Sequence, residues 1–130
     1  MQAVIDFLKE SGTFYLATIE GDQPRVRPFG AVIIFDGKMH ICTNNKKPVS
    51  AQMKNNAKIE ISGIVKDDWI RLTATAVLDD RKEARQAMLD AYPGLASMYS
   101  ADDGVYEVYA VENARAVIQS FVGRNDCYEF

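Results

Sequence analysis

The sequence predicts a mainly β fold with helices (α+β), a barrel or a sandwich, formed as a single domain over residues 1–130. Two observations support this fold class. First, about six or seven short segments have the composition or the alternation of β-strands, with turn residues between them. Second, a chain of 130 residues with 48% hydrophobic content can bury one ordinary core, and it contains no internal repeat or linker.

The first part of the chain predicts a helix followed by three antiparallel strands. Apolar residues at helical spacing before Ser11-Gly12 indicate a short amphipathic helix over residues 2–11. Asp36-Gly37 is a strong signal for a short hairpin between the second and third strands. The nearly all-apolar run over residues 30–35 is expected to be buried on both faces. The strands are expected over residues 13–19, 24–35 and 39–43.

The middle of the chain predicts a helix and two further strands. Proline suits the first turn of a helix because its missing N–H would have no partner there, so a helix is expected over residues 48–55. In the second of the two strands, alternate residues are apolar, and the other face carries Trp69 and Arg71. Such a face is adapted to a ligand or to another chain. The two strands are expected over residues 59–65 and 69–78.

The last part of the chain predicts two helices and two strands. Asp79-Asp80 precede a segment of helical composition, at the end where the helix dipole favours acids. Pro93-Gly94 ends that helix, and Glu112-Asn113-Ala114 is expected to turn one strand into the next. The helices are expected over residues 81–91 and 95–99, and the strands over residues 105–111 and 115–121.

Charge and cysteine usage argue against several classes of function. The formal net charge is −3 and the Lys and Arg residues are scattered, whereas a nucleic-acid surface needs a concentrated basic stripe. Cys42 and Cys127 form no C-x-x-C pair, so neither a zinc site nor a redox dithiol is indicated. No basic segment followed by an apolar run stands at the N-terminus, and no segment approaches bilayer-spanning length. We therefore expect a cytoplasmic protein without a membrane partner.

Cations gather at strand ends on both sides of the predicted tight turn. Arg25 and Arg27 lie near the start of the strand before the turn. Lys46 and Lys47 follow the strand after it, in a polar loop that leads into a helix. Guanidinium and ammonium groups, with the free N–H groups of a helix start, fit a phosphate. The combination predicts the anchor of a phosphorylated cofactor.

Each of these cations also has a plainer interpretation. For Arg25, an ion pair with Glu20 or Asp22 across the first hairpin is an equal alternative. Lys46 and Lys47 can be solvated loop charges, and at most one of them is expected to face a phosphate. Only the combination of the cations favours a ligand.

Taken in order, the segments resemble the pyridoxamine 5′-phosphate oxidase-like flavoproteins. The resemblance implies a split β-barrel that forms a homodimer, with FMN in a groove between the two subunits. No single segment is specific, but together they cover most of the chain in the order of the family. The matching segments are residues 13–18, 24–30, 41–44 with 46–47, 69–72 and 91–93.

The resemblance assigns roles to individual residues. Arg27 corresponds to the strand arginine that reaches the FMN phosphate, with Arg25 as its neighbour, and Lys47 corresponds to the lysine that reaches the same phosphate. Lys47 is therefore favoured over Lys46. The remaining expected contacts are Val26, Pro28 and Phe29 to the flavin ring system, hydrogen bonds from Thr43 and Asn44, a helix contact from Gln52, and Trp69 and Arg71 from the partner chain.

In such a protein the flavin carries the reaction, while the protein orients it and excludes water. The resemblance thus implies an FMN-dependent oxidoreductase that acts with a small organic substrate or a nicotinamide donor. The alternative is a flavin-binding carrier, store or sensor without turnover. Deazaflavin and haem are other cofactors of this fold, although His40, the single histidine, offers little for haem ligation. The C-terminal arginine and histidine with which pyridoxamine phosphate oxidases hold the substrate phosphate are missing, so that reaction is not expected.

Overall fold

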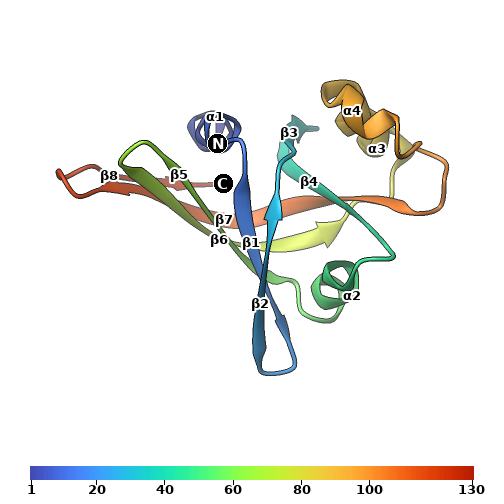
Figure 1. Cartoon of the computed structure of the whole chain (residues 1–130), viewed down its shortest axis with the longest axis horizontal. Coiled ribbons are helices and arrows are strands. Elements are labelled where there is room, and N and C mark those ends of the chain that lie inside the picture. Colours follow the sequence, from blue (N-terminus) through green and yellow to red (C-terminus); the bar gives the residue numbers. More distant parts are fainter.

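The computed structural model describes residues 1–130 and contains four helices and eight strands (Figure 1). No helix in it has both the length and the apolar character needed to cross a membrane. In chain order, the elements are α1 (Gln2–Ser11), β1 (Phe14–Glu20), β2 (Gln23–Phe29), β3 (Val32–Phe35), β4 (Lys38–Asn44), α2 (Pro48–Asn55), β5 (Lys58–Val65), β6 (Asp68–Leu78), α3 (Lys82–Ala91), α4 (Pro93–Ala96), β7 (Tyr106–Ser120) and β8 (Asn125–Glu129).

All strands belong to one antiparallel sheet with the order β2-β1-β5-β6-β7-β4-β3, and β8 pairs with the second half of β7. β2 and β3 follow each other in the chain, yet they stand at opposite ends of this order and do not pair. The sheet is therefore open where the chain passes from Phe29 to Val32. We call this opening the seam.

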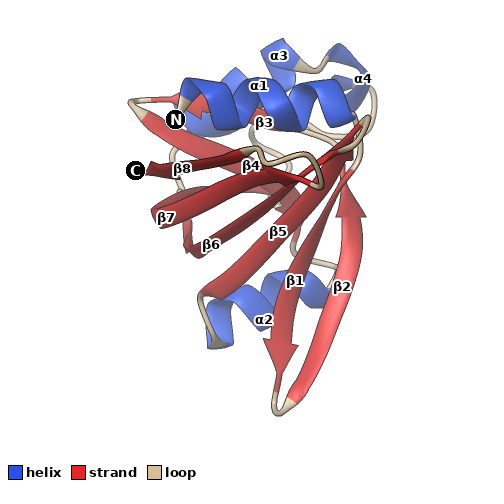
Figure 2. Ribbon diagram, turned by 90° about the vertical axis from the view of Figure 1, so that its left-hand side faces the viewer, coloured by secondary structure: helices blue, strands red, loops and turns tan.

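Helices cover the two ends of the curved sheet (Figure 2). α1 packs on β3 and β5 at one end, and α2 packs on β1, β4 and β6 at the other. α3 packs on β3 and β7, with α4 beside it. The apolar side chains of α1, α2 and the inner strand faces form a core cluster of 22 residues, and eight more residues form a second cluster between α3 and the sheet. This arrangement confirms the expected mainly β fold with helices.

The tight turns follow the chemistry that the sequence indicated. Asp36 and Gly37 have φ values of 51° and 73°, so both central residues of the β3–β4 turn are left-handed, as in a type I′ turn. Aspartate and glycine tolerate that conformation better than other residues. The predicted hairpin at this position is thus confirmed.

Two of the expected strands have different boundaries in the structure. Residues 24–35 do not form one strand, because the chain leaves β2 at Phe29 and begins β3 at Val32. β3 is not buried on both faces either, since Ile34 is exposed. The two strands expected at 105–111 and 115–121 are one long strand, β7. Asn113 does not turn the chain there: it adopts a φ of 51° within a β-bulge, and pairing with β6 continues on both sides.

Two further differences concern the C-terminal half. The expected helix at 95–99 is α4, which begins earlier, at Pro93. β8 was not expected, because it is a short edge strand of mostly polar residues without apolar alternation. The division at the seam and β8 add two strands, and the union of two expected strands in β7 removes one, so the structure has eight strands where six or seven were expected.

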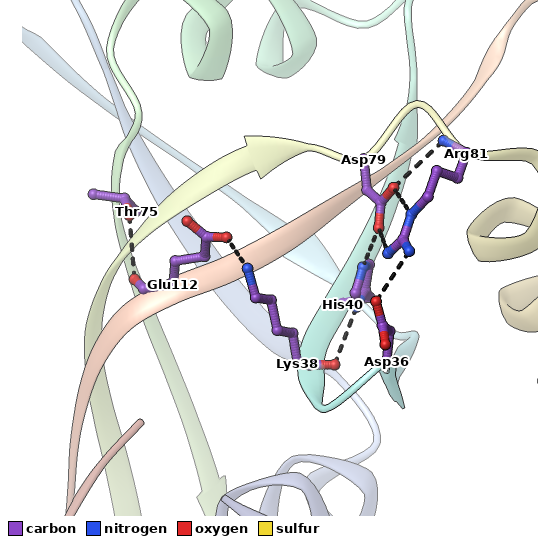
Figure 3. Close-up of polar contacts among 7 residues, drawn as sticks. All are labelled: Asp36, Lys38, His40, Thr75, Asp79, Arg81 and Glu112. Carbon is purple, nitrogen blue, oxygen red and sulfur yellow. Dashed lines mark hydrogen bonds and ion pairs between the residues drawn. The ribbon is translucent and has the colours of Figure 1, made fainter.

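His40 and Asp79 join β4 to the loop between β6 and α3 (Figure 3). The His40 ring is buried, with Nε2 2.8 Å from an Asp79 carboxylate oxygen and Nδ1 3.0 Å from the Lys38 carbonyl oxygen. The Arg81 guanidinium donates two hydrogen bonds to Asp79 and one to Asp36. The Arg81 guanidinium above all, with His40, holds the pKa of Asp79 well below its usual range against the opposing effect of burial.

This network predicts a pH-dependent contribution to stability. Because the pKa of Asp79 is lower in the folded state than its unfolded value of about 3.9, its stabilisation is present above about pH 4 and is lost as the pH falls further. We expect Asp79→Asn to lower the free energy of unfolding by about 1–3 kcal/mol at pH 7, and the difference from wild type to shrink below about pH 4. Urea unfolding over a pH series measures both.

Asp80→Asn is the matched control, because the neighbouring Asp80 side chain is 86% exposed. It should change the free energy of unfolding by less than about 0.5 kcal/mol. A deficit in Asp79→Asn that stays constant down to about pH 3 would contradict the assignment.

Candidate functional site

Two cavities meet at the seam. The first, which we call the aromatic cleft, has a volume of about 380 Å³ and lies between the seam, β4 and the α3–α4 segment. The second, which we call the basic cavity, has a volume of about 600 Å³ and lies between β2 and the start of α2. Both fall in the usual range for small-molecule sites, about 300–1,000 Å³. The residues that line both are Arg27, Pro28, Lys47 and Val49.

Arg27 stands between the two cavities and is held by neutral groups. Its Nη1 donates to the Thr18 hydroxyl at 2.8 Å and to the Leu16 carbonyl oxygen at 3.1 Å. Its Nη2 donates to the side-chain oxygen of Gln52 at 2.6 Å. Partial burial, and to a lesser degree the nearby Arg25, lowers the pKa of Arg27, but the guanidinium stays charged at neutral pH. Its charge therefore has a fixed position.

The charges around the basic cavity are not balanced. Arg25 forms an exposed ion pair with Glu20 at 3.0 Å, so the pairing alternative considered for Arg25 is confirmed. A hydrogen bond from Gln52, followed by Arg25, lowers the pKa of Glu20, so this partner is ionised at neutral pH. Arg27 and Lys47 form no ion pair with any carboxylate. The cavity thus carries two cations without counter-charge.

The start of α2 adds to the positive electrostatic potential of the basic cavity. Lys47 is the N-cap residue of the helix and Pro48 occupies its first turn. The N-terminal end of a helix carries a partial positive charge, and Lys47 places a full charge next to it. Arg27, Lys47 and the helix end together form a donor set suited to a phosphate.

The aromatic cleft is mostly apolar, and tyrosines form much of its wall. The Tyr92 hydroxyl bonds both the N–H and the carbonyl oxygen of Val32, which ties the α3–α4 segment to the start of β3. The Tyr99 ring stacks on that of Tyr106 with centroids 4.8 Å apart, and its hydroxyl accepts a hydrogen bond from Asn44 at 2.6 Å. A flat, apolar ring system fits such walls.

One polar atom of this wall is without a partner. The hydroxyl of Tyr106 is buried and makes no hydrogen bond to a nitrogen or oxygen atom, and its neighbour is the Cys42 thiol, a weak hydrogen-bonding group. Burial raises the pKa of the Tyr106 hydroxyl, and Cys42 adds to the effect. Burial likewise raises the pKa of Cys42, so the thiol is neutral at pH 7. Neither group is therefore an activated nucleophile.

The structure brings most of the expected site residues together. Eight of the twelve line one or both cavities: Arg25, Val26, Arg27, Pro28, Phe29, Thr43, Lys47 and Gln52.

The other four lie outside the cavities. The Asn44 amide is occupied by Tyr99 and by the backbone N–H of Lys46, whose own side chain is exposed. Trp69 and Arg71 are on the outer face of β6, where Trp69 packs on Phe121 and Arg71 lies 4.0 Å from Glu60.

Several residues of the site were not expected from the sequence. Thr18 could have been found, because the pairing of the first hairpin places it opposite Arg25 and on the same side as Arg27. Tyr92 lies in the matching segment 91–93, but no contact was assigned to it. Tyr99 and Tyr106 carry no local signal, because they reach the cleft only through the packing of α3 and α4 on the sheet.

Comparison with known proteins identifies the family of the chain. The model of the pyridoxamine 5′-phosphate oxidase family matches residues 1–119. The chain belongs to this family. A NimC/NimA family protein from Clostridium acetobutylicum, known from a crystal structure, is 48% identical, with a TM-score of 0.96 over 100% of this chain and 93% of that one. The sequence-based resemblance to pyridoxamine 5′-phosphate oxidase-like proteins is thereby confirmed.

More distant structures share the fold with this member of the pyridoxamine 5′-phosphate oxidase family. General stress protein 26 from Bacillus anthracis has a TM-score of 0.75 at 12% identity over 99% of this chain and 97% of that one. The haem-storage protein HutZ from Vibrio cholerae has a TM-score of 0.67 at 12% identity over 85% and 87% of the two chains. At this identity the likeness shows the fold alone. No curated protein matches the chain.

Removing the hydroxyl groups of two tyrosines in the aromatic cleft is expected to change the free energy of unfolding in opposite directions. Tyr106→Phe removes a buried hydroxyl without a partner, so we expect the free energy of unfolding to rise by about 1–2 kcal/mol. Tyr99→Phe removes the acceptor of the Asn44 amide, so we expect a loss of about 1 kcal/mol. Urea unfolding of the two variants measures the difference. Equal destabilisation by both would mean that the Tyr106 hydroxyl has a partner in solution.

Proposed function

We propose that this family member binds FMN, with the phosphate in the basic cavity and the flavin ring toward the aromatic cleft. The observation that carries this proposal is the pair of uncompensated cations, Arg27 and Lys47, at the boundary of the two cavities. A phosphate monoester bears up to two negative charges at neutral pH, and two cations at a helix start match it.

The two cavities also suit the two ends of the cofactor. They share four residues, so a ligand with a charged group at one end and a ring at the other can extend through both. Pro28 and Phe29 continue from Arg27 along β2, which would place apolar contacts beside the ring. Thr43 lies across the cleft on β4 and would add a polar contact at the ring edge.

We propose that the protein is an oxidoreductase that uses this flavin. Bound FMN would supply hydride or electron transfer with a small organic substrate or a nicotinamide donor. The chain's own residues would then bind and orient: Arg27 and Lys47 hold the phosphate, and the apolar walls formed by Phe29, Leu95 and Met98 exclude water from the ring.

A homodimer would complete the site. Trp69 and Arg71 face away from the aromatic cleft and the basic cavity of their own chain, and we propose that they reach the site of a partner chain. Next to Trp69 the outer surface exposes the large apolar side chains of Ile64, Phe121 and Val122. Exposed apolar groups of this kind are typical of surfaces that bind a protein. We propose that the second copy of the chain covers them.

A carrier or store without turnover is the second candidate. The fold supports storage in at least one distant case, since HutZ from Vibrio cholerae is a haem-storage protein. In this chain, however, both nitrogens of the only histidine are engaged, by Lys38 and Asp79. This arrangement favours a flavin over a haem ligated by His40. The carrier hypothesis therefore concerns flavin.

The phosphate assignment predicts the effect of removing both cations. We expect Arg27→Ala with Lys47→Ala to weaken FMN binding by on the order of 3–6 kcal/mol, because two charge-assisted contacts are lost. Quenching of flavin fluorescence during titration measures the affinity. Lys46→Ala is the control, since Lys46 lines neither cavity, and it should bind FMN as the wild type does. Unchanged affinity in the double variant would defeat the assignment.

The two candidate functions differ in what the bound flavin does. An oxidoreductase should pass electrons from reduced, protein-bound FMN to an added acceptor faster than free FMN does. A carrier should pass them no faster. Stopped-flow absorbance of the flavin distinguishes the two, with sedimentation of the same sample reporting whether the protein is a dimer.

A further inference from the structure

We infer that Gln52 and Thr18 set the specificity of the site for a phosphate, because they position Arg27 without neutralising its charge. Gln52 is thus a positioning residue that acts through Arg27. The inference rests on the proposed function, in which Arg27 meets the phosphate of FMN, and goes beyond it by naming the residues that keep this cation available.

The contacts form a closed set of hydrogen bonds between β1, β2 and α2. The side-chain oxygen of Gln52 accepts from the Thr18 hydroxyl at 2.5 Å and from Arg27 Nη2 at 2.6 Å. The Thr18 oxygen in turn accepts from Arg27 Nη1 at 2.8 Å. Gln52 and Thr18 are only 5% and 2% exposed, so the groups that orient the guanidinium are themselves fixed by packing.

Glu20 fixes the orientation of the Gln52 amide. The Gln52 side-chain nitrogen donates to Glu20 Oε2 at 3.2 Å, while Glu20 Oε1 accepts from Arg25. A carboxylate can only accept, so the amide must turn its nitrogen toward Glu20 and its oxygen toward Arg27. The carboxylate of Glu20 thus orients Gln52 and pairs with Arg25, and neither of its oxygens lies within 4.0 Å of the Arg27 guanidinium.

Arg27 differs from every other arginine of the chain in this respect. The other six each have a carboxylate oxygen within 4.0 Å, whereas Arg27 has none. A partly buried guanidinium usually has an acidic partner, because burial of an unpaired charge is costly. Here the neutral oxygens of Thr18, Gln52 and Leu16 accept from Nη1 and Nη2, while Nε makes no hydrogen bond within the chain. The full charge of the guanidinium is left to attract an anion.

Gln52→Glu is the direct test, because it puts a carboxylate of nearly the same shape against Arg27. We expect FMN to bind about 10–100-fold more weakly than to wild type, while the affinity for riboflavin, which lacks the phosphate, stays within about threefold. A role of Gln52 in stability alone would change both affinities equally. FMN affinity within threefold of wild type would overturn the inference.

Gln52→Glu also places two carboxylates next to each other, which disfavours folding. A second variant therefore tests the same contact without this repulsion. In Glu20→Gln with Gln52→Glu, the amide and the carboxylate exchange places, which preserves the net charge and the hydrogen bond between the two side chains. The negative charge then moves from Arg25 to Arg27. We expect the same loss of FMN affinity here. Glu20→Gln alone frees Arg25 and keeps an amide oxygen that can accept from Gln52, so it should bind FMN at least as tightly as wild type does.

Inorganic phosphate distinguishes a failure of this inference from a failure of the proposed function. If wild type binds no FMN, the proposed function is wrong, but phosphate should still raise the melting temperature of wild type and not that of the Gln52→Glu variant. If wild type binds FMN and the two variants with Glu at position 52 bind it equally well, only the inference is wrong. Equal effects of phosphate on wild type and on Gln52→Glu would also overturn it.

Discussion

The open seam between β2 and β3 is the constraint on which the rest of the structure depends. A fully closed barrel of this size would fill its interior with side chains. Here the sheet stops short of closure, and consecutive strands stand at opposite ends of its order. The residues along this opening are the ones that line the aromatic cleft, with α2 below and α3–α4 beside it. The fold thus produces a site by leaving one pairing unmade, and α1 and α2 protect the core at the two ends.

At this seam, the groups that hold the Arg27 guanidinium in place do not neutralise its charge. Elsewhere on the surface, arginine and carboxylate side chains pair directly, as in Arg25 with Glu20. Arg27 is instead held by neutral oxygens from the strand beside it and from α2, at the point where the basic cavity meets an apolar cleft. A ligand with an anionic end and a flat ring is complementary to this combination, and the family to which the chain belongs agrees with it.

The sequence allowed the local features to be predicted, and the differences come from tertiary structure. Asp36-Gly37 specifies its turn through the backbone freedom of two residues, so the β3–β4 hairpin was predictable. Strand and helix boundaries indicated the group of cations, and the family resemblance singled out Arg27 and Lys47 among them. The break between β2 and β3 at the seam was not predicted, because an apolar run does not show which strand will pair with it. Tyr106 meets the cleft only after α3 and α4 have packed, and Gln52 shows its role only through its contacts with β1 and β2.

The most direct test of this account is a parallel titration of the wild-type protein with FMN and riboflavin. The two ligands share the ring and differ in the phosphate, so their affinity ratio isolates the contribution of Arg27 and Lys47. The account predicts that FMN binds at least about 100-fold more tightly, the equivalent of about 2.7 kcal/mol, and that added salt reduces the ratio. Equal affinities would contradict the assignment of a phosphate to the basic cavity.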